Sequence, residues 1–258
     1  MKLSDFNMVT GCGDSDRVIM RYKDICRIGC FSGTREEAIK AIEIKYKGLA
    51  KDTYIAKINE LFTTDISSYK ERGIDITANN NYAIQLASEN GHLEVVKYLG
   101  KHGADVTASD NRAVQWASRS GYLEVIKYLV SQGADVATNN IRAIQLASGN
   151  GHLEVVKYLV KHGADVTADD NYAVIQASIN GHLKIVKYLV SQGADVTAGG
   201  NYALQWASYN GHLKVVKYLV KHGADITAGD NYAINTAFNN GHSEVAKYLA
   251  SQGAILDQ

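Results

Sequence analysis

Hydrophobic and polar positions along most of the chain follow one pattern that repeats every 30 residues. Each unit begins with a short segment that carries small and aliphatic residues at helical spacing, such as Ala83, Ile84 and Ala87. In a second segment, apolar residues cover most of the helix circumference and leave one polar stripe, which includes Glu94 and Lys97. This periodicity predicts two helices per unit, and the second is expected to be buried on two sides.

Glycines separate the predicted helices. Gly91 and its equivalents follow the first helix, and Gly103 and its equivalents follow the second. Glycine adopts the left-handed backbone that commonly ends a helix, so each unit is expected to read helix, turn, helix, short polar finger. Turn-forming residues occupy the tips of the predicted fingers: Asn79-Asn80, Ser109-Asp110, Asn139-Asn140, Asp169-Asp170, Gly199-Gly200 and Gly229-Asp230.

A single unit of this kind cannot hide its apolar surface, whereas stacked units bury a continuous core. A fixed period of this length is typical of solenoid proteins. The sequence therefore predicts an all-α solenoid of six stacked helix-turn-helix units, at residues 81–110, 111–140, 141–170, 171–200, 201–230 and 231–258.

The second helix and the turn after it, read in one unit as NGHLEVVKYLVKHGADVTA, resemble the ankyrin repeat. Two departures stand out: the period is shorter than the roughly 33 residues of the family, and Tyr82-Ala83-Ile84-Gln85 replaces the family's Thr-Pro-Leu-His. This shortened, proline-free version is similar to ankyrin proteins of giant DNA viruses of amoebae. The resemblance implies a non-enzymatic protein-interaction module, in origin a viral protein that acts inside a host cell.

Residues 1–80 do not follow the repeat closely. Cys30-Phe31-Ser32-Gly33 and Gly73-Ile74-Asp75-Ile76-Thr77-Ala78 echo parts of it, so we interpret this region as an N-terminal cap of degenerate repeats. Terminal repeats are expected to differ from inner ones because one face has no neighbour. In the last unit, smaller or polar residues replace the apolar residues of the inner units: Ser243, Ala246 and Ala250.

Composition narrows the function classes. The 27 basic and 27 acidic side chains cancel, which argues against nucleic acid or a membrane as a partner of the molecule as a whole. No long uncharged apolar run and no secretory signal is visible, and proline is absent. All three cysteines lie in the first 30 residues, which excludes a disulfide framework and favours a reducing compartment. We expect an intracellular monomer, in the host cytoplasm if viral and not secreted.

The eight histidines recur at two repeat positions, which indicates a structural role in every unit rather than catalysis. One set follows the first glycine and is expected to hydrogen-bond a turn between units; the other precedes the second glycine and alternates with glutamine. These residues are His92, His152, His182, His212 and His242, then His102, His162 and His222.

An alternative is that residues 1–80 form a catalytic or metal-binding unit carried by the repeats. Cys26 and Cys30 could share a helix face, with Cys12 as a third zinc ligand. No histidine precedes His92, no C-x-x-C pair occurs, and no phosphate-binding glycine signature is present. We therefore predict no catalytic residue, no cofactor and no metal ligand. A further alternative is a structural, virion-associated protein without a specific partner.

Two lysine pairs break the Glu-Lys pattern of the second helices. Lys184 with Lys187, and Lys214 with Lys217, form a basic stripe on two neighbouring units. A solvated helix face explains such a stripe, and an acidic partner or nucleic acid is the alternative.

Variation between units concentrates on one stripe of the predicted first helices. In the family, this stripe and the fingers line a concave face that binds proteins, and aromatic and arginine side chains are favoured in protein-binding hot spots. Packing of the aromatic residues between first helices is the alternative. The candidate residues are Tyr82, Leu86, Glu89, Arg112, Trp116, Arg119, Arg142, Leu146, Tyr172, Gln176, Ile179, Tyr202, Trp206, Tyr209 and Tyr232.

Overall fold

A computed structural model of the protein describes residues 6–9, 19–22, 77–137 and 141–256. The chain divides into two compact units, Met1–Ser67 and Ser68–Gln258. In the first unit, strands β1 (Phe6–Val9) and β2 (Ile19–Tyr22) pair antiparallel. The pattern of the repeats did not predict these strands. Most of the proposed N-terminal cap, with its three cysteines, lies outside the described residues.

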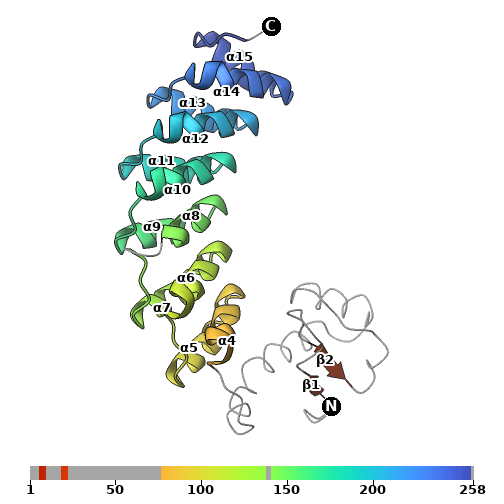
Figure 1. Ribbon diagram of the computed structural model, residues 1–258, viewed down its shortest axis with the longest axis vertical. Helices are drawn as coiled ribbons and strands as arrows, with labels where there is room; N and C mark the ends of the chain where they lie inside the picture. The colour runs from red at the N-terminus through yellow and green to blue at the C-terminus, as the bar shows by residue number, and fades with distance from the viewer. Residues whose placement is uncertain (1–5, 10–18, 23–76, 138–140, 257–258) are drawn as a thin grey trace. The chain divides into compact units, whose positions relative to one another are not determined.

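The described part of the second unit contains twelve helices, which form six helix-turn-helix pairs and confirm the all-α solenoid (Figure 1). The first helices of the pairs are α4 (Ala78–Glu89), α6 (Ala108–Ser120), α8 (Ile141–Gly149), α10 (Ala168–Ile179), α12 (Ala198–Tyr209) and α14 (Ala228–Asn239). The second helices are α5 (Leu93–Lys101), α7 (Leu123–Ser131), α9 (Leu153–Lys161), α11 (Leu183–Ser191), α13 (Leu213–Lys221) and α15 (Ser243–Ser251).

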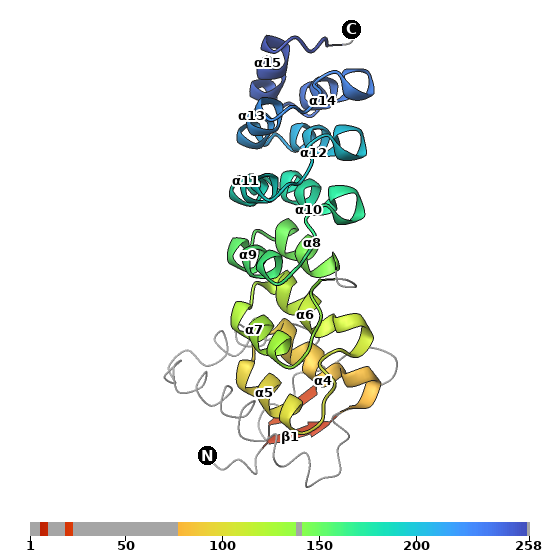
Figure 2. The ribbon, with the colours of Figure 1, turned by 90° about the vertical axis from the view of Figure 1, so that its left-hand side faces the viewer.

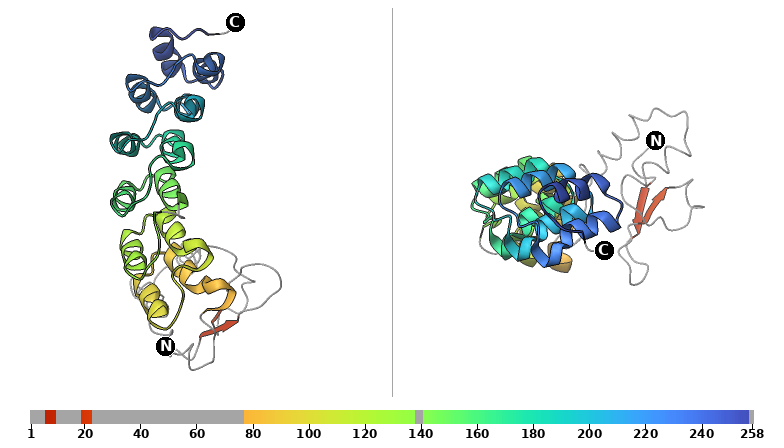
Figure 3. Two further views of the ribbon diagram at one scale, coloured as in Figure 1. Left: turned by 60° about the vertical axis from the view of Figure 1, so that its left-hand side comes forward. Right: turned by 90° about the horizontal axis from the view of Figure 1, so that it is seen from above.

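The helices stack in two rows, with the first helices in one row and the second helices in the other (Figures 2 and 3). Neighbouring first helices contact each other far more extensively than neighbouring second helices do. Closer packing in one row curves the stack toward that row. The first helices therefore line the inner, concave side of the repeats.

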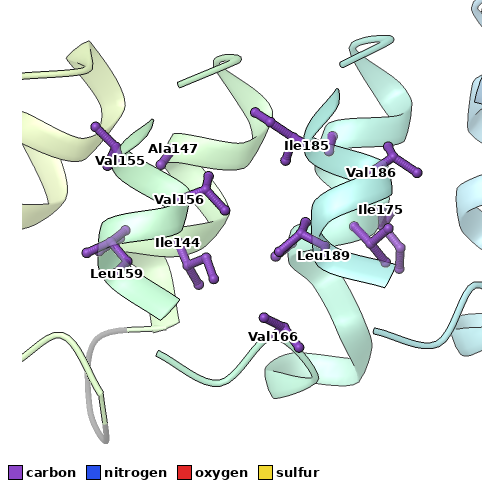
Figure 4. Close-up of a cluster of buried hydrophobic side chains, with 14 of the residues drawn as sticks. Ile144, Ala147, Val155, Val156, Leu159, Val166, Ile175, Ile185, Val186 and Leu189 are labelled. Carbon is purple, nitrogen blue, oxygen red and sulfur yellow. The ribbon is translucent and has the colours of Figure 1, made fainter. Parts of the chain in front are cut away.

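A continuous apolar core runs between the two rows. Second helices contribute pairs such as Val156 and Leu159, or Val186 and Leu189, and none of these four side chains is exposed (Figure 4). First helices add smaller residues at the interfaces, such as the fully buried Ala147. Burial on both sides of the second helix, as its sequence predicts, follows from this arrangement.

The predicted fingers are single left-handed turns. In every first helix except α8, the second to fourth residues have positive φ, for example 53° at Asp169, 54° at Asp170 and 61° at Asn171. Asparagine, aspartate and glycine tolerate this conformation better than other residues. The turn-forming pairs predicted from sequence occupy these positions, apart from Asn139-Asn140, which lies outside the described residues.

The asparagine that closes each left-handed turn connects it to the next turn of the stack. The Asn171 side-chain oxygen, Oδ1, accepts a hydrogen bond from the backbone N–H of Asp195 at 2.8 Å. Position 141 holds isoleucine instead, which has no oxygen to offer Asp165. The same bond joins four other pairs: Asn81 to Asp105, Asn111 to Asp135, Asn201 to Asp225 and Asn231 to Ile255.

Histidines after the first glycine tie neighbouring units together, which confirms their predicted structural role. His152 Nε2 donates to the carbonyl of Arg119 at 2.9 Å, and His212 Nε2 donates to that of Ile179 at 2.9 Å. A carbonyl can only accept, so Nε2 carries the proton. The rings lie against the glycines of the preceding units: a Cβ added to Gly181 would lie 2.6 Å from His212 Nδ1.

The alternation of His and Gln at the end of the second helices has a local explanation. His162 Nδ1 donates to the Tyr158 carbonyl at 2.8 Å, and its ring stacks on that of Tyr158. In the units with glutamine, the serine before it makes the equivalent hydrogen bond. Ser191 Oγ donates to the Tyr188 carbonyl at 2.6 Å. Both sequences therefore add a side-chain donor to a carbonyl in the last turn of the helix, which also accepts a backbone hydrogen bond.

Candidate protein-binding surface

All fifteen candidate residues lie on the first helices, and none of them is fully buried. Eight are exposed: Arg112, Arg119, Arg142, Tyr172, Tyr202, Trp206, Tyr209 and Tyr232. Seven are half-buried: Tyr82, Leu86, Glu89, Trp116, Leu146, Gln176 and Ile179.

Exposed aromatic rings concentrate in the fourth to sixth units. Tyr202 is 51% exposed and Trp206 is 40% exposed, although both have large apolar side chains. The Trp206 ring meets the Tyr209 ring edge-on, with 5.3 Å between their centres, which holds both rings on helix α12. Tyr172 and Tyr232 extend the exposed aromatic row to α10 and α14. We name Tyr172, Tyr202, Trp206, Tyr209 and Tyr232 the aromatic row.

The two tryptophans occupy the same repeat position but differ in surroundings. Trp116 meets the ring of Tyr82, from the preceding unit, edge-on at 6.3 Å and is half-buried. Packing between first helices, the alternative for these aromatic residues, therefore describes Trp116. Trp206 packs instead on Tyr209 of its own helix and stays exposed.

Charge divides the stripe into two halves. Arg112, Arg119 and Arg142 belong to the second and third units, and within the described residues none of them forms an ion pair. The stripe residues of the fourth to sixth units carry no charge. The concave side thus presents a half with three arginines and one glutamate, Glu89, followed by an uncharged, aromatic half.

Another exposed apolar group lies at the end of the last unit. Phe238 is 57% exposed and Ile255 is 68% exposed. In the inner units a buried serine, such as Ser178, occupies the position of Phe238. Ser243 and Ala250 are exposed as expected for a terminal unit, whereas Ala246 is buried, and Phe238 adds an aromatic ring there. In the sequence, the change from Ser to Phe at one repeat register is the signal that marks this group.

The turn after each second helix except α15 holds an acidic side chain that organises backbone rather than binding a ligand. Asp165 Oδ1 accepts hydrogen bonds from Thr167 Oγ1 at 2.7 Å and from its backbone N–H at 2.8 Å. These bonds lower the pKa of Asp165, and the same bonds from Thr227 lower the pKa of Asp225.

Across the part of the chain that the structure describes, no three His, Cys, Asp or Glu side chains are placed to share a metal ion. Over the same residues, every helix is too short or too polar to span a bilayer.

Stacked helix pairs with a shared core and a variable, exposed concave side define a helical solenoid repeat protein. A family model described as "Ankyrin repeats (3 copies)" matches residues 53–140, 137–199 and 197–258. The chain therefore belongs to the ankyrin repeat family. Ankyrin repeats are generally protein–protein interaction modules, and the fold is typically non-catalytic.

Among solved structures, the repeats are similar to the human ASB11 ankyrin repeat domain. The two share 22% sequence identity with a TM-score of 0.61, over 68% of this chain and 85% of that one. This likeness concerns the fold alone. A comparison with proteins of curated function finds no match.

Proposed function

We propose that this protein is a non-enzymatic interaction module whose partner protein lies along the concave side and the adjoining turns. The exposed aromatic row supports this proposal most directly. Large aromatic side chains bury much area at a small entropy cost, and they dominate many protein interfaces. The arginines at 112, 119 and 142 offer acidic groups of the partner a place to bind.

The partner is proposed to be a host protein. The chain itself is proposed to be a monomeric viral protein that binds this partner inside the host cell. The shortened, proline-free repeat, similar to those of giant DNA viruses of amoebae, supports this part of the proposal. The six repeats themselves form the binding unit, at 81–110, 111–140, 141–170, 171–200, 201–230 and 231–258, with residues 1–80 as an N-terminal cap.

The test replaces Trp206 and Tyr209 together by alanine. Both rings are exposed and contact each other, so their loss removes apolar surface from the concave side but leaves the buried core intact. We expect the double variant to lose the proteins that the wild type captures from amoebal lysate, as identified by quantitative mass spectrometry. Its melting temperature is expected to stay within a few degrees of the wild type.

Glu124→Ala with Lys127→Ala is the matched control. These residues form an exposed ion pair on α7, in the row of second helices, and are expected to matter little for stability or capture. Capture of the same proteins by the wild type and by Trp206→Ala/Tyr209→Ala would contradict the proposal.

A further inference from the structure

Most of the second helices carry a Glu–Lys ion pair on their exposed face. Two of them lack it. Glu and Lys three residues apart are joined at 2.8 Å in α5 (Glu94, Lys97), and equivalent pairs occur in α7, α9 and α15. In α11 and α13 the glutamate is replaced by Lys184 and Lys214. The two neighbouring helices are therefore the ones with unneutralised cations at this register.

We name Lys184, Lys187, Lys214, Lys217 and Lys221 the basic strip. All five side chains are exposed, and no ion pair involves them within the described residues. Tyrosine rings hold two of them in place. The Lys187 ammonium lies 5.7 Å from the centre of the Tyr218 ring, and that of Lys217 lies 5.4 Å from the centre of the Tyr248 ring.

The lysines at 184 and 214 are unfavourable for the helices that carry them. Each is the second residue of its helix, where the positive end of the helix dipole disfavours a cation and favours an acid. Each substitution also removes an i, i+3 ion pair. The two lysines therefore lower the stability of two adjacent helices. A charge pattern that lowers stability in this way points to a role in binding rather than in folding.

We propose that the basic strip is a second docking surface, separate from the concave side, for an acidic segment of a partner protein. Charge complementarity selects an anionic partner. The strip spans about 10 Å along α13, since Lys221 lies seven positions after Lys214, and about 10 Å across neighbouring helices. A few carboxylates on one turn of a peptide fill an area of this size.

The flanking helices argue against a longer polyanion. Glu154 on α9 and Glu244 on α15 occupy the same register on either side of the strip. A nucleic acid strand or an anionic membrane that extends beyond α11 and α13 would meet these carboxylates. A short acidic peptide segment meets only the lysines.

The decisive variant is Lys184→Glu with Lys214→Glu, which restores the pattern of the other four helices. Its melting temperature is expected to equal or exceed that of the wild type, so a binding defect would not come from unfolding. We expect a labelled hexaglutamate peptide, measured by fluorescence anisotropy, to bind the wild-type full chain and to lose about tenfold in affinity with this variant.

Two further variants separate position from net charge. Lys101→Glu with Lys161→Glu changes the net charge equally, but on helices outside the strip, and is expected to leave peptide affinity within about twofold. Glu124→Lys with Glu154→Lys creates the same lysine pattern on α7 and α9, and should add a second binding site for the peptide.

Three results would overturn the proposal. The first is that the wild type and all the variants bind hexaglutamate with the same affinity. The second is that a ten-nucleotide single strand or phosphatidylserine vesicles bind the wild type as tightly as hexaglutamate or more tightly, and that Lys184→Glu/Lys214→Glu loses this binding. The third is self-association, seen by sedimentation, that Lys184→Glu/Lys214→Glu abolishes, because a second copy would then fill the strip through its acidic turns.

Discussion

At the scale of single residues, one asparagine in five of the six units satisfies two demands at once. Asn171 adopts a left-handed backbone, which asparagine tolerates, and its Oδ1 reaches the backbone N–H of Asp195 in the next turn. Glycine meets only the first demand, and alanine meets neither. Ile141 breaks the row, and the backbone N–H of Asp165 has no hydrogen-bond partner within the described residues.

Asn171→Ala is therefore expected to lower the free energy of unfolding by about 1–2 kcal/mol, through one lost hydrogen bond and a strained left-handed alanine. The reciprocal change, Ile141→Asn, should raise it by less than about 1 kcal/mol, because residue 141 does not have positive φ and must change its backbone conformation before the new acceptor reaches Asp165. Urea unfolding followed by circular dichroism measures both. Equal stability of Asn171→Ala and the wild type would show that the row of bonds between turns is dispensable.

At the scale of helices, the repeat pattern predicted much of the structure because each unit obeys the same local rules. Periodicity located both helices of a pair, and Gly181 and Gly193, with φ of 74° and 100°, end them as expected. The exposure of Trp116 and Trp206 was not predictable from their shared register. It depends on neighbours that vary: Tyr82 covers one ring, whereas Trp206 has Tyr209 on its own helix. Strands β1 and β2 lie outside the repeat and left no such signal.

Glycines at the two helix ends are expected to differ in importance. Gly181→Ala and Gly223→Ala both force alanine into positive φ, at 74° and 96°, which costs about 1–2 kcal/mol. Only Gly181 has a ring against it: an added Cβ would displace His212 and break its bond to the Ile179 carbonyl, whereas the space at Gly223 is open.

Gly181→Ala should therefore destabilise the protein by about 1–2 kcal/mol more than Gly223→Ala does, as measured by urea unfolding. Combining each change with His212→Ala supplies the control, because the excess cost should shrink once the ring is absent. An excess that persists without the ring would mean that backbone strain, rather than contact between units, limits this position.

At the scale of the whole repeat unit, two rows of helices allow two surfaces to vary separately. The aromatic row belongs to the first helices and the basic strip to the second helices of the same stretch of chain. Between them lie buried side chains such as Val186 and Leu204, neither of which is exposed at all. The constant core therefore permits substitution on either side without a change in packing.

Independence of the two surfaces follows and can be measured. Trp206→Ala/Tyr209→Ala should bind hexaglutamate like the wild type, and Lys184→Glu/Lys214→Glu should keep the proteins that the aromatic row captures. A protein with all four changes should show both losses without an extra one, because sites with no shared contacts contribute additively. Loss of peptide binding in the aromatic variant, at unchanged stability, would instead mean that one partner spans both rows or that binding on one side alters the other.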